Sequence, residues 1–278
     1  LLPRAIESVL AQTAIEQCDV VVVDDGSTDA TPAAAARYAE RIIYIRRPNG
    51  GLAVARNTAI RAHPNEFVAF LDDDDLWEPE KIQRQLAALQ HWPKAALVAG
   101  RTVDCYPDGR QTLHPIPPVP LDRPAAFAQR MIEGTFLPPS SVMVRGRALF
   151  AAGLFHPRLR WAEDYLLFTR MACRAPCIFL DAVVTRYFVA TPGALSNNAA
   201  AMQVHQLRGR YLLRRELRLR PDCRESWERG LARSLTDLRD LAYRQGRFTA
   251  AARWGLCSLL HRPCGRARWE WARFFEAA

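Results

Sequence analysis

Three short apolar runs, separated by helix-forming segments, constrain the fold of this 278-residue chain more than any other feature. The runs are "CDVVVV" at 18–23, "RIIYI" at 41–45 and "FVAFL" at 67–71. The first is almost continuously β-branched, which is typical of a strand buried on both faces. Residues 31–40 and 51–62 have helical patterns. This alternation predicts an α/β fold, with a mostly parallel sheet flanked by helices.

The pattern continues beyond the third run. We expect strands at 95–100 and 140–144, helices at 79–92 and 162–175, and an irregular Pro-rich loop at 106–124. From about residue 199 the pattern is helical almost to the end. We therefore divide the chain into an α/β domain, residues 1–198, and a helical C-terminal region, residues 199–278.

The charge distribution separates the same two regions. Residues 1–200 hold 21 basic and 21 acidic side chains, whereas residues 201–278 hold 17 arginines and 8 acidic side chains, which gives the whole net charge of +9. A solvated basic face is the commonest explanation of such charge. Peripheral contact with an anionic membrane is an alternative. No recognition-helix motif is present, so a nucleic-acid partner is not expected.

Other residue types narrow the class of protein. The seven cysteines form no CxxC pair, so we expect reduced thiols and a cytoplasmic setting. The six histidines show no HxxxH or HExxH spacing. No apolar run approaches the ~18–20 residues that span a bilayer.

Acidic clusters follow two of the predicted strands. Asp24 and Asp25 come after "VVVV", and residues 72–75, all aspartate, come after "FVAFL". Ligands of open α/β sheets bind beyond the carboxyl ends of the strands. Several carboxylates at one edge repel each other unless a cation offsets them, and Mg²⁺ uses carboxylates together with substrate phosphates. The clusters therefore predict a metal-bound, phosphorylated substrate, although helix caps or Asx turns would use the same residues.

The chain resembles the family 2 inverting glycosyltransferases of the GT-A, Rossmann-like fold. The resemblance covers roughly residues 1–198 and rests on five segments in the family's order. These are "VVVVDDGSTDAT" (20–31), "NGGLAVARNTAI" (49–60), "FLDDDDLWEP" (70–79), "AEDYLLFTRM" (162–171) and "YFVATPGALS" (187–196).

The resemblance implies roles for the donor-binding residues. Asp24 and Asp25 would face the base and ribose of a nucleotide, and Gly51 and Arg56 would approach the nucleotide or its phosphates. A solvent-facing helix arginine is the alternative for Arg56.

The resemblance also implies a metal site and a general base. Asp72 and Asp74 would form the site for Mn²⁺ or Mg²⁺, with Asp74 as the direct ligand, while Asp72 and Asp73 would serve the ribose and the metal's waters. Glu163 and Asp164 occupy the family's ED position, where Asp164 would be the general base. An acidic first turn that complements the helix dipole is the alternative for this pair.

The expected activity is therefore metal-dependent transfer of a sugar, with inversion, from a nucleotide-diphospho-sugar to an acceptor hydroxyl. A UDP-sugar is expected from the family, and the acceptor would be a saccharide or a lipid-linked molecule of cell-envelope polysaccharide synthesis. The chain has neither the QxxRW motif of processive synthases nor membrane helices, so we expect a non-processive enzyme in the cytoplasm or at the inner face of the membrane.

Two departures from the family keep alternatives open. The chain starts at "LLPRAIESVLAQT", inside a helical pattern and after the family's first strand and its nucleotide-contacting loop. Ala190 or Thr191 stands where the closing segment often carries a histidine near the metal. The alternatives are a degenerate module that binds a nucleotide sugar without turnover, and a nucleotidyltransferase of similar fold.

Overall fold

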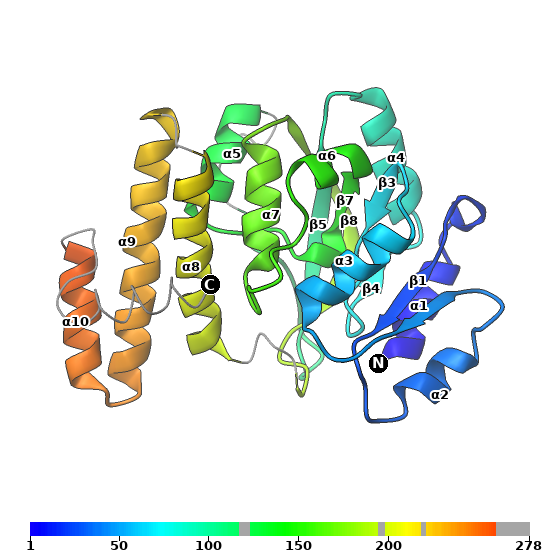
Figure 1. Ribbon diagram of the computed structural model, residues 1–278, viewed down its shortest axis with the longest axis horizontal. Coiled ribbons are helices and arrows are strands. Elements are labelled where there is room, and N and C mark those ends of the chain that lie inside the picture. The colour runs from blue at the N-terminus through cyan, green and yellow to red at the C-terminus, as the bar shows by residue number, and fades with distance from the viewer. Residues whose placement is uncertain (117–122, 194–197, 218–220, 260–278) are drawn as a thin grey trace.

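The computed structural model describes residues 1–116, 123–193, 198–217 and 221–259. They form an α/β part and, beside it, a layer of helices from the C-terminal region (Figure 1). Two sheets carry the strands, which are β1 (Val21–Asp24), β2 (Ile43–Arg46), β3 (Phe67–Ala69), β4 (Leu76–Trp77), β5 (Leu97–Cys105), β6 (Gln111–Leu113), β7 (Val142–Arg145) and β8 (Cys177–Phe188).

Helices cover the sheets and extend the molecule. Those of the α/β part are α1 (Leu2–Leu10), α2 (Thr31–Ala36), α3 (Leu52–Ala62), α4 (Lys81–His91), α5 (Pro124–Glu133), α6 (Gly146–Ala151) and α7 (Glu163–Ala172). Those of the C-terminal region are α8 (Ala199–Leu217), α9 (Pro221–Arg244) and α10 (Phe248–Leu259). The predicted α/β class and the helical C-terminal region are confirmed. No helix within the described ranges is long and apolar enough to cross a bilayer.

The strand pairing is more mixed than the mostly parallel sheet that the sequence predicted. β1 and β2 pair in parallel, as do β5 and β8. Four other pairs are antiparallel: β3 with β7, β4 with β8, and β5 with both β6 and β7. For β6 the physical reason is that it follows its partner β5 after a short turn, which is too short for the crossover that a parallel neighbour requires.

Alternating side chains place the larger sheet between two apolar layers. Leu97, Val142 and Val144 belong to the cluster packed against α5 and α7. Val98 and Met143, from the same strands, belong to the opposite cluster, which is formed with α1 and α4. Since successive strand side chains point to opposite faces, this alternation fixes β5 and β7 between both layers.

The C-terminal helices pack on the side of α5 and α7 that faces away from the sheet (Figure 1). Their shared core contains Ile132 and Leu166 from the α/β part and Trp227, Leu231 and Leu235 from α9. The two parts of the chain are therefore joined by a continuous apolar contact.

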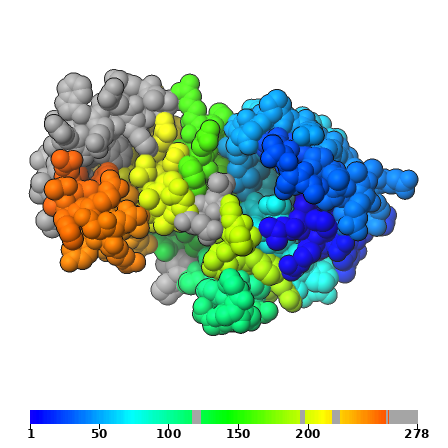
Figure 2. All heavy atoms as spheres, turned by 90° about the horizontal axis from the view of Figure 1, so that it is seen from below, coloured from blue at the N-terminus to red at the C-terminus, as the bar shows by residue number. Residues whose placement is uncertain are grey.

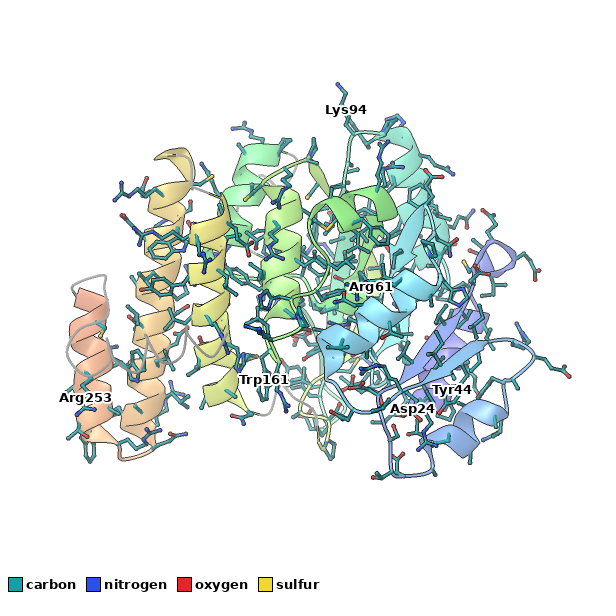
Figure 3. The ribbon with its side chains drawn as sticks, in the orientation of Figure 1. Asp24, Tyr44, Arg61, Lys94, Trp161 and Arg253 are labelled. Carbon is teal, nitrogen blue, oxygen red and sulfur yellow. The ribbon has the colours of Figure 1, made fainter. Side chains whose placement is uncertain are left out.

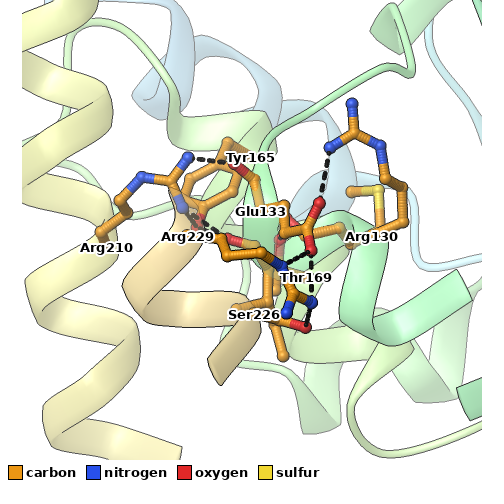
Figure 4. A network of polar contacts seen from close by, with 9 residues as sticks. Arg130, Glu133, Tyr165, Thr169, Arg210, Ser226 and Arg229 are labelled. Carbon is orange, nitrogen blue, oxygen red and sulfur yellow. Dashed lines mark hydrogen bonds and ion pairs between the residues drawn. The ribbon is translucent and has the colours of Figure 1, made fainter. Parts of the chain in front are cut away.

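Arg210 of α8 forms the polar centre of this contact (Figure 4). Its side chain is only 1% exposed. The guanidinium donates to the carbonyls of Ile132 and Glu133, to the Tyr165 hydroxyl at 3.2 Å and to Ser234 Oγ at 3.0 Å. Its acceptors are all uncharged, so Arg210 joins α8 to α5, α7 and α9 by satisfied hydrogen bonds rather than by an ion pair.

Cys18, Cys105, Cys177 and Cys223 are free thiols, and Cys264 lies outside the described residues. Part of the predicted loop 106–124 is instead β6 and the start of α5, while residues 117–122 are not described.

Candidate functional site

Asp24 and Asp25 lie at the end of β1, and Asp25 holds the segment that leads into α3. Asp24 is buried, and Oδ1 accepts from the backbone N–H of Ser27 at 2.7 Å, while Oδ2 accepts from the Tyr44 hydroxyl (Figure 3). Burial opposes the charge, but these hydrogen bonds lower the pKa of Asp24. Asp25 pairs with Arg47.

Gly51, which precedes α3, is bound by Asp25. Its N–H donates to Asp25 Oδ2 at 2.6 Å, and its φ of +88° is in the region that favours glycine. Gly26 has a φ of +82°, and a Cβ there would lie 2.8 Å from the Asn49 nitrogen. Gly26 therefore allows the two loops to approach closely, whereas Gly51 is favoured by its backbone conformation alone.

The four consecutive aspartates form the turn between β3 and β4. The N–H of Asp75 donates to the carbonyl of Asp72 at 3.1 Å. Asp75 is fully buried, and it accepts from Ser140 Oγ at 2.5 Å and from the Phe188 N–H at 3.2 Å. Burial, and then the charge of Asp72, raises the pKa of Asp75 to about 8. Asp75 thus anchors the turn to β8. The other three aspartates do not share these two hydrogen bonds and are more exposed than Asp75.

Asp72, Asp73 and Asp74 form the accessible part of the turn. Asp73 is exposed, and Asp72 and Asp74 are half-buried. Burial and then the charge of Asp72 raise the pKa of both Asp73 and Asp74, while a hydrogen bond from Thr191 works against that rise at Asp74. The segment after β8 therefore reaches the turn, as the family's order of motifs implied.

Arg56 on α3 joins this turn to α7. One guanidinium nitrogen lies 2.5 Å from Asp72 Oδ1 and the other 2.8 Å from Glu163 Oε1. The guanidinium carbon lies 5.2 Å from the centre of the Phe155 ring. Burial opposes the charge of Arg56, but Asp72 and Glu163 raise its pKa. The arginine therefore connects the residues of the predicted metal site with those of the predicted catalytic pair.

Glu163 and Asp164 begin α7. Ala162 before them has a φ of 56°, an uncommon value for a residue with a side chain. Glu163 is buried, whereas Asp164 is partly exposed and accepts from the N–H of Tyr165 at 2.7 Å. Burial raises the pKa of both carboxyls, and Arg56 works against the rise. A raised pKa makes a carboxylate a stronger base as long as it stays ionised, and Arg56 favours the ionised form of both groups.

The donor set fits a divalent cation that is shared with a phosphorylated ligand. Asp72, Asp73 and Asp74 offer hard carboxylate oxygens, and their mutual repulsion favours a cation. Within the described ranges, no three His, Cys, Asp or Glu side chains converge on a metal position. The chain would therefore supply one or two carboxylates and leave the other positions to phosphate and water, as Mg²⁺ prefers.

Several residues of the site were not identified from the sequence. Ser140 accepts from the N–H of Asp72 at 3.1 Å as well as donating to Asp75. Asn57 Nδ2 donates to the carbonyl of Phe155 at 2.8 Å, and the N–H of Phe155 donates to Asn57 Oδ1 at 3.0 Å. Asn57 follows Arg56 directly in the "ARN" segment, and this position next to a predicted site residue could have identified it. Ser140 lies in none of the segments that carry the resemblance, so nothing in the sequence marked it.

A family comparison identifies most of the α/β part. The model of "Glycosyl transferase family 2" matches residues 1–152, more than half of the chain. ExoW of Rhizobium meliloti, a succinoglycan biosynthesis protein, is 33% identical over 185 residues, which cover 60% of this chain and 57% of ExoW. An uncharacterised glycosyltransferase of Rickettsia typhi is 26% identical over 185 residues, covering 64% of this chain and 56% of that protein. The chain thus spans little more than half of these relatives.

Solved structures share the fold over nearly the whole chain. The mannosyltransferase PcManGT of Pyrobaculum calidifontis, in complex with GDP-Man and Mn²⁺, has a TM-score of 0.62 at 18% identity, covering 100% of this chain and 76% of that one. Residues 1–349 of S. aureus TarS with UDP-GlcNAc give a TM-score of 0.58 at 18% identity, covering 94% of this chain and 88% of that one. At this identity the likeness supports the predicted GT-A fold.

Proposed function

The chain belongs to glycosyl transferase family 2, and from this premise we propose that it transfers a sugar from a nucleotide-diphospho-sugar to an acceptor hydroxyl with inversion. The observation that carries the proposal is the position of Arg56, which joins Asp72 of the aspartate turn to Glu163 of α7. Donor binding and proton removal would thereby occur in one site.

Asp164 is the proposed general base. Its carboxylate accepts the proton of the acceptor hydroxyl as the hydroxyl oxygen attacks the anomeric carbon. The bond between that carbon and the phosphate oxygen breaks, and the nucleoside diphosphate leaves. One displacement inverts the anomeric carbon, so no second carboxylate is required as a nucleophile. Glu163, held by Arg56, orients the start of α7.

Asp74 is the proposed direct ligand of Mn²⁺ or Mg²⁺. Arg56 already binds one oxygen of Asp72, which leaves Asp74 as the less engaged carboxylate. When bound, the cation would neutralise charge on the leaving diphosphate. Asp24, Asp25, Gly51 and Asp73 would line the nucleoside side of the donor.

The donor and acceptor classes belong to the same proposal. A UDP-sugar is proposed as the donor, in line with the UDP-GlcNAc bound to TarS. A saccharide or lipid-linked acceptor of polysaccharide synthesis is proposed in line with the name of ExoW. A place in the cytoplasm or at the inner membrane face suits such an acceptor.

Asp164→Asn tests the proposed base. The amide is nearly isosteric but does not accept a proton, so we expect a kcat lower by about 10²–10⁴-fold with little change in donor affinity. Nucleotide release with acceptor present and donor binding without acceptor measure the two quantities. Normal turnover in this variant would remove Asp164 from the mechanism, and turnover absent from the wild type as well would favour a binding module.

Asp74→Ala tests the proposed metal ligand. Nucleotide affinity measured by calorimetry in the presence of Mn²⁺ should fall to the value measured in chelator. Glu78→Ala is the matched control, because Glu78 pairs with Arg186 outside the turn. An unchanged Mn²⁺ dependence in Asp74→Ala would exclude Asp74 as the ligand.

A further inference from the structure

Residues 156–162 form an arginine-containing loop whose two ends are fixed to α3. The residue before the loop, Phe155, exchanges two backbone hydrogen bonds with the side chain of Asn57. The residue after it, Glu163, is bound by Arg56. The loop is therefore held beside α3 and leads directly into the proposed base at the start of α7.

Two arginines of this loop differ from the paired arginines of the α/β part. Arg145, Arg170 and Arg186 each form an ion pair with a glutamate. Arg158 and Arg160 are exposed, and neither guanidinium makes an ion pair or a hydrogen bond within the part of the chain that the structure describes. Their charge is therefore available to a ligand.

Helix α8 faces the loop from the other side. The rings of Trp161 and His205 lie 5.0 Å apart between their centres, at 50°. A Cβ on Gly209 would lie 3.3 Å from the ring of Tyr165, so α8 runs close against the start of α7. In Figure 3 Trp161 lies in the lower half of the molecule, as do Asp24 and Tyr44. Figure 2 shows the molecule from below.

His205 adds a hydrogen-bonding group with unused capacity. Its Nδ1 atom is buried and has no hydrogen-bond partner among the described residues. Burial, followed by the charges of Arg208 and Arg160, lowers the pKa of His205. Burial and the charge of Arg158 lower the pKa of Arg208. Loop and helix thus bring like charges together, an arrangement that an anion would stabilise.

Building on the proposed function, we propose that this loop and the facing side of α8 form an acceptor subsite for a phosphate group. Arg158 and Arg160 are its cationic residues, and His205 lies beside them against Trp161. Guanidinium groups bind phosphate oxygens through paired, charge-assisted hydrogen bonds. Two guanidiniums suit a phosphate better than a sugar carboxylate, which carries one charge on two oxygens.

The subsite belongs to the acceptor rather than to the donor. The donor's diphosphate is proposed to lie at Asp74, on the aspartate turn, and the Arg56–Glu163 ion pair stands between that turn and the loop. The loop leads directly into Glu163 and the proposed base, where the acceptor hydroxyl must lie. A phosphate bound here would thus position the acceptor for attack.

Direct binding tests the subsite without relying on turnover. The first probe is a short, soluble glycerol-phosphate oligomer, measured by calorimetry. The second is a phosphatidylcholine vesicle containing a polyprenyl diphosphate, measured by co-sedimentation. The full chain is compared with Arg158→Gln/Arg160→Gln, for which we expect affinity at least about tenfold weaker for the probe that binds. By ¹⁵N NMR, the pKa of His205 should rise when that probe is added.

Arg41→Gln/Arg61→Gln is the matched control, because both residues are exposed and the variant removes the same charge. Its affinity should stay within about twofold of the wild type. Binding of the oligomer identifies a phosphodiester acceptor, and binding of the vesicle alone identifies a lipid diphosphate. Equal losses in the two double variants, no loss in either, or no binding of either probe would overturn the subsite. Asp164→Asn should bind the probes normally, so failure of the proposed base is distinguishable from failure of this subsite.

Discussion

The guanidinium groups of two arginines are surrounded by different kinds of acceptors. Arg56, in the candidate site, lies between two carboxylates, which raise its pKa although burial opposes them. Arg210, under the C-terminal helices, is bound to carbonyl and hydroxyl oxygens, and burial lowers its pKa. One arginine is balanced by charge and the other only by hydrogen bonds.

The difference separates function from stability. A buried guanidinium that is satisfied by uncharged acceptors fixes the positions of the elements that supply them, here α5, α7 and α9. A guanidinium between carboxylates also favours their ionised form and orients their side chains. We therefore expect loss of Arg210 to reduce the stability of the fold and loss of Arg56 to reduce turnover.

Arg210→Met should have the largest effect on stability. It leaves the carbonyls of Ile132 and Glu133 without their donor in a space shaped for a guanidinium, where a Cβ on Gly230 would lie 2.1 Å from Nη1. We expect the free energy of unfolding in urea to fall by about 3–5 kcal/mol. Arg214→Met is the control, since Arg214 is exposed and stacks on Trp227, and this variant should lose under about 1 kcal/mol. Similar losses in the two variants would refute the role of Arg210.

Arg56→Met should show the opposite profile. Loss of a preorganised cation beside Asp72 and Glu163 should lower kcat/KM by about 10²–10³-fold. Stability should fall by less than in Arg210→Met, because burial already raises the pKa of Glu163 and the freed carboxyls can take up protons. Turnover and urea unfolding are measured together, with exposed Arg61→Met on the same helix as the control. If Arg56→Met kept normal turnover but lost much of its stability, Arg56 would have a structural role like that of Arg210.

Much of this arrangement was predictable because local patterns determine it. The runs at 20–23 and 67–71 are short, apolar and rich in β-branched or aromatic residues, which favours strands, and the aspartates after them mark the strand ends. The α/β class could be predicted from these runs, the helical C-terminal region from its own helical pattern, and the family from the resemblance of the five motif segments. The contact between Arg56 and Glu163 could not, because the two residues are separated by 107 positions and meet only through tertiary packing.

The missed elements have physical reasons as well. β8 is the longest strand, yet its sequence "CIFLDAVVTRYF" is interrupted by Asp181 and Arg186. Both are surface residues. Asp181 pairs with Arg101 on β5, and Arg186 pairs with Glu78 after β4. The charges that interrupt the apolar pattern therefore connect β8 to its neighbours. Asp75 was indistinguishable from the aspartates before it, because only the tertiary partners Ser140 and Phe188 give it a different role.

Asp75 extends the comparison to pH, where the expected effect is small for each pH unit. Burial raises its pKa from 3.8 to about 8, so between these values the folded state holds a proton that the unfolded state has released. Its contribution to stability is therefore present below about pH 4 and falls as the pH rises to about 8, by roughly 1 kcal/mol per pH unit. Asp75→Asn, whose amide can donate to Ser140 Oγ and accept from Phe188 N–H, should remove that fall in urea unfolding measured across the range.

Lys81 provides the control for this pH dependence, because its shift has the opposite sign. Burial lowers its pKa from 10.5 to about 7, so the unfolded state binds the extra proton and stability rises between these pH values. Lys81→Met should remove the rise in the free energy of unfolding above pH 7 and leave its pH dependence below pH 7 unchanged. Asp75→Asn should remove the fall below pH 7 and leave the rise above pH 7 unchanged. If Asp75→Asn keeps the wild-type slope between pH 4 and 7, Asp75 is ionised in the folded protein. The turn would then carry a fourth negative charge, which Arg56 and a bound cation would have to offset.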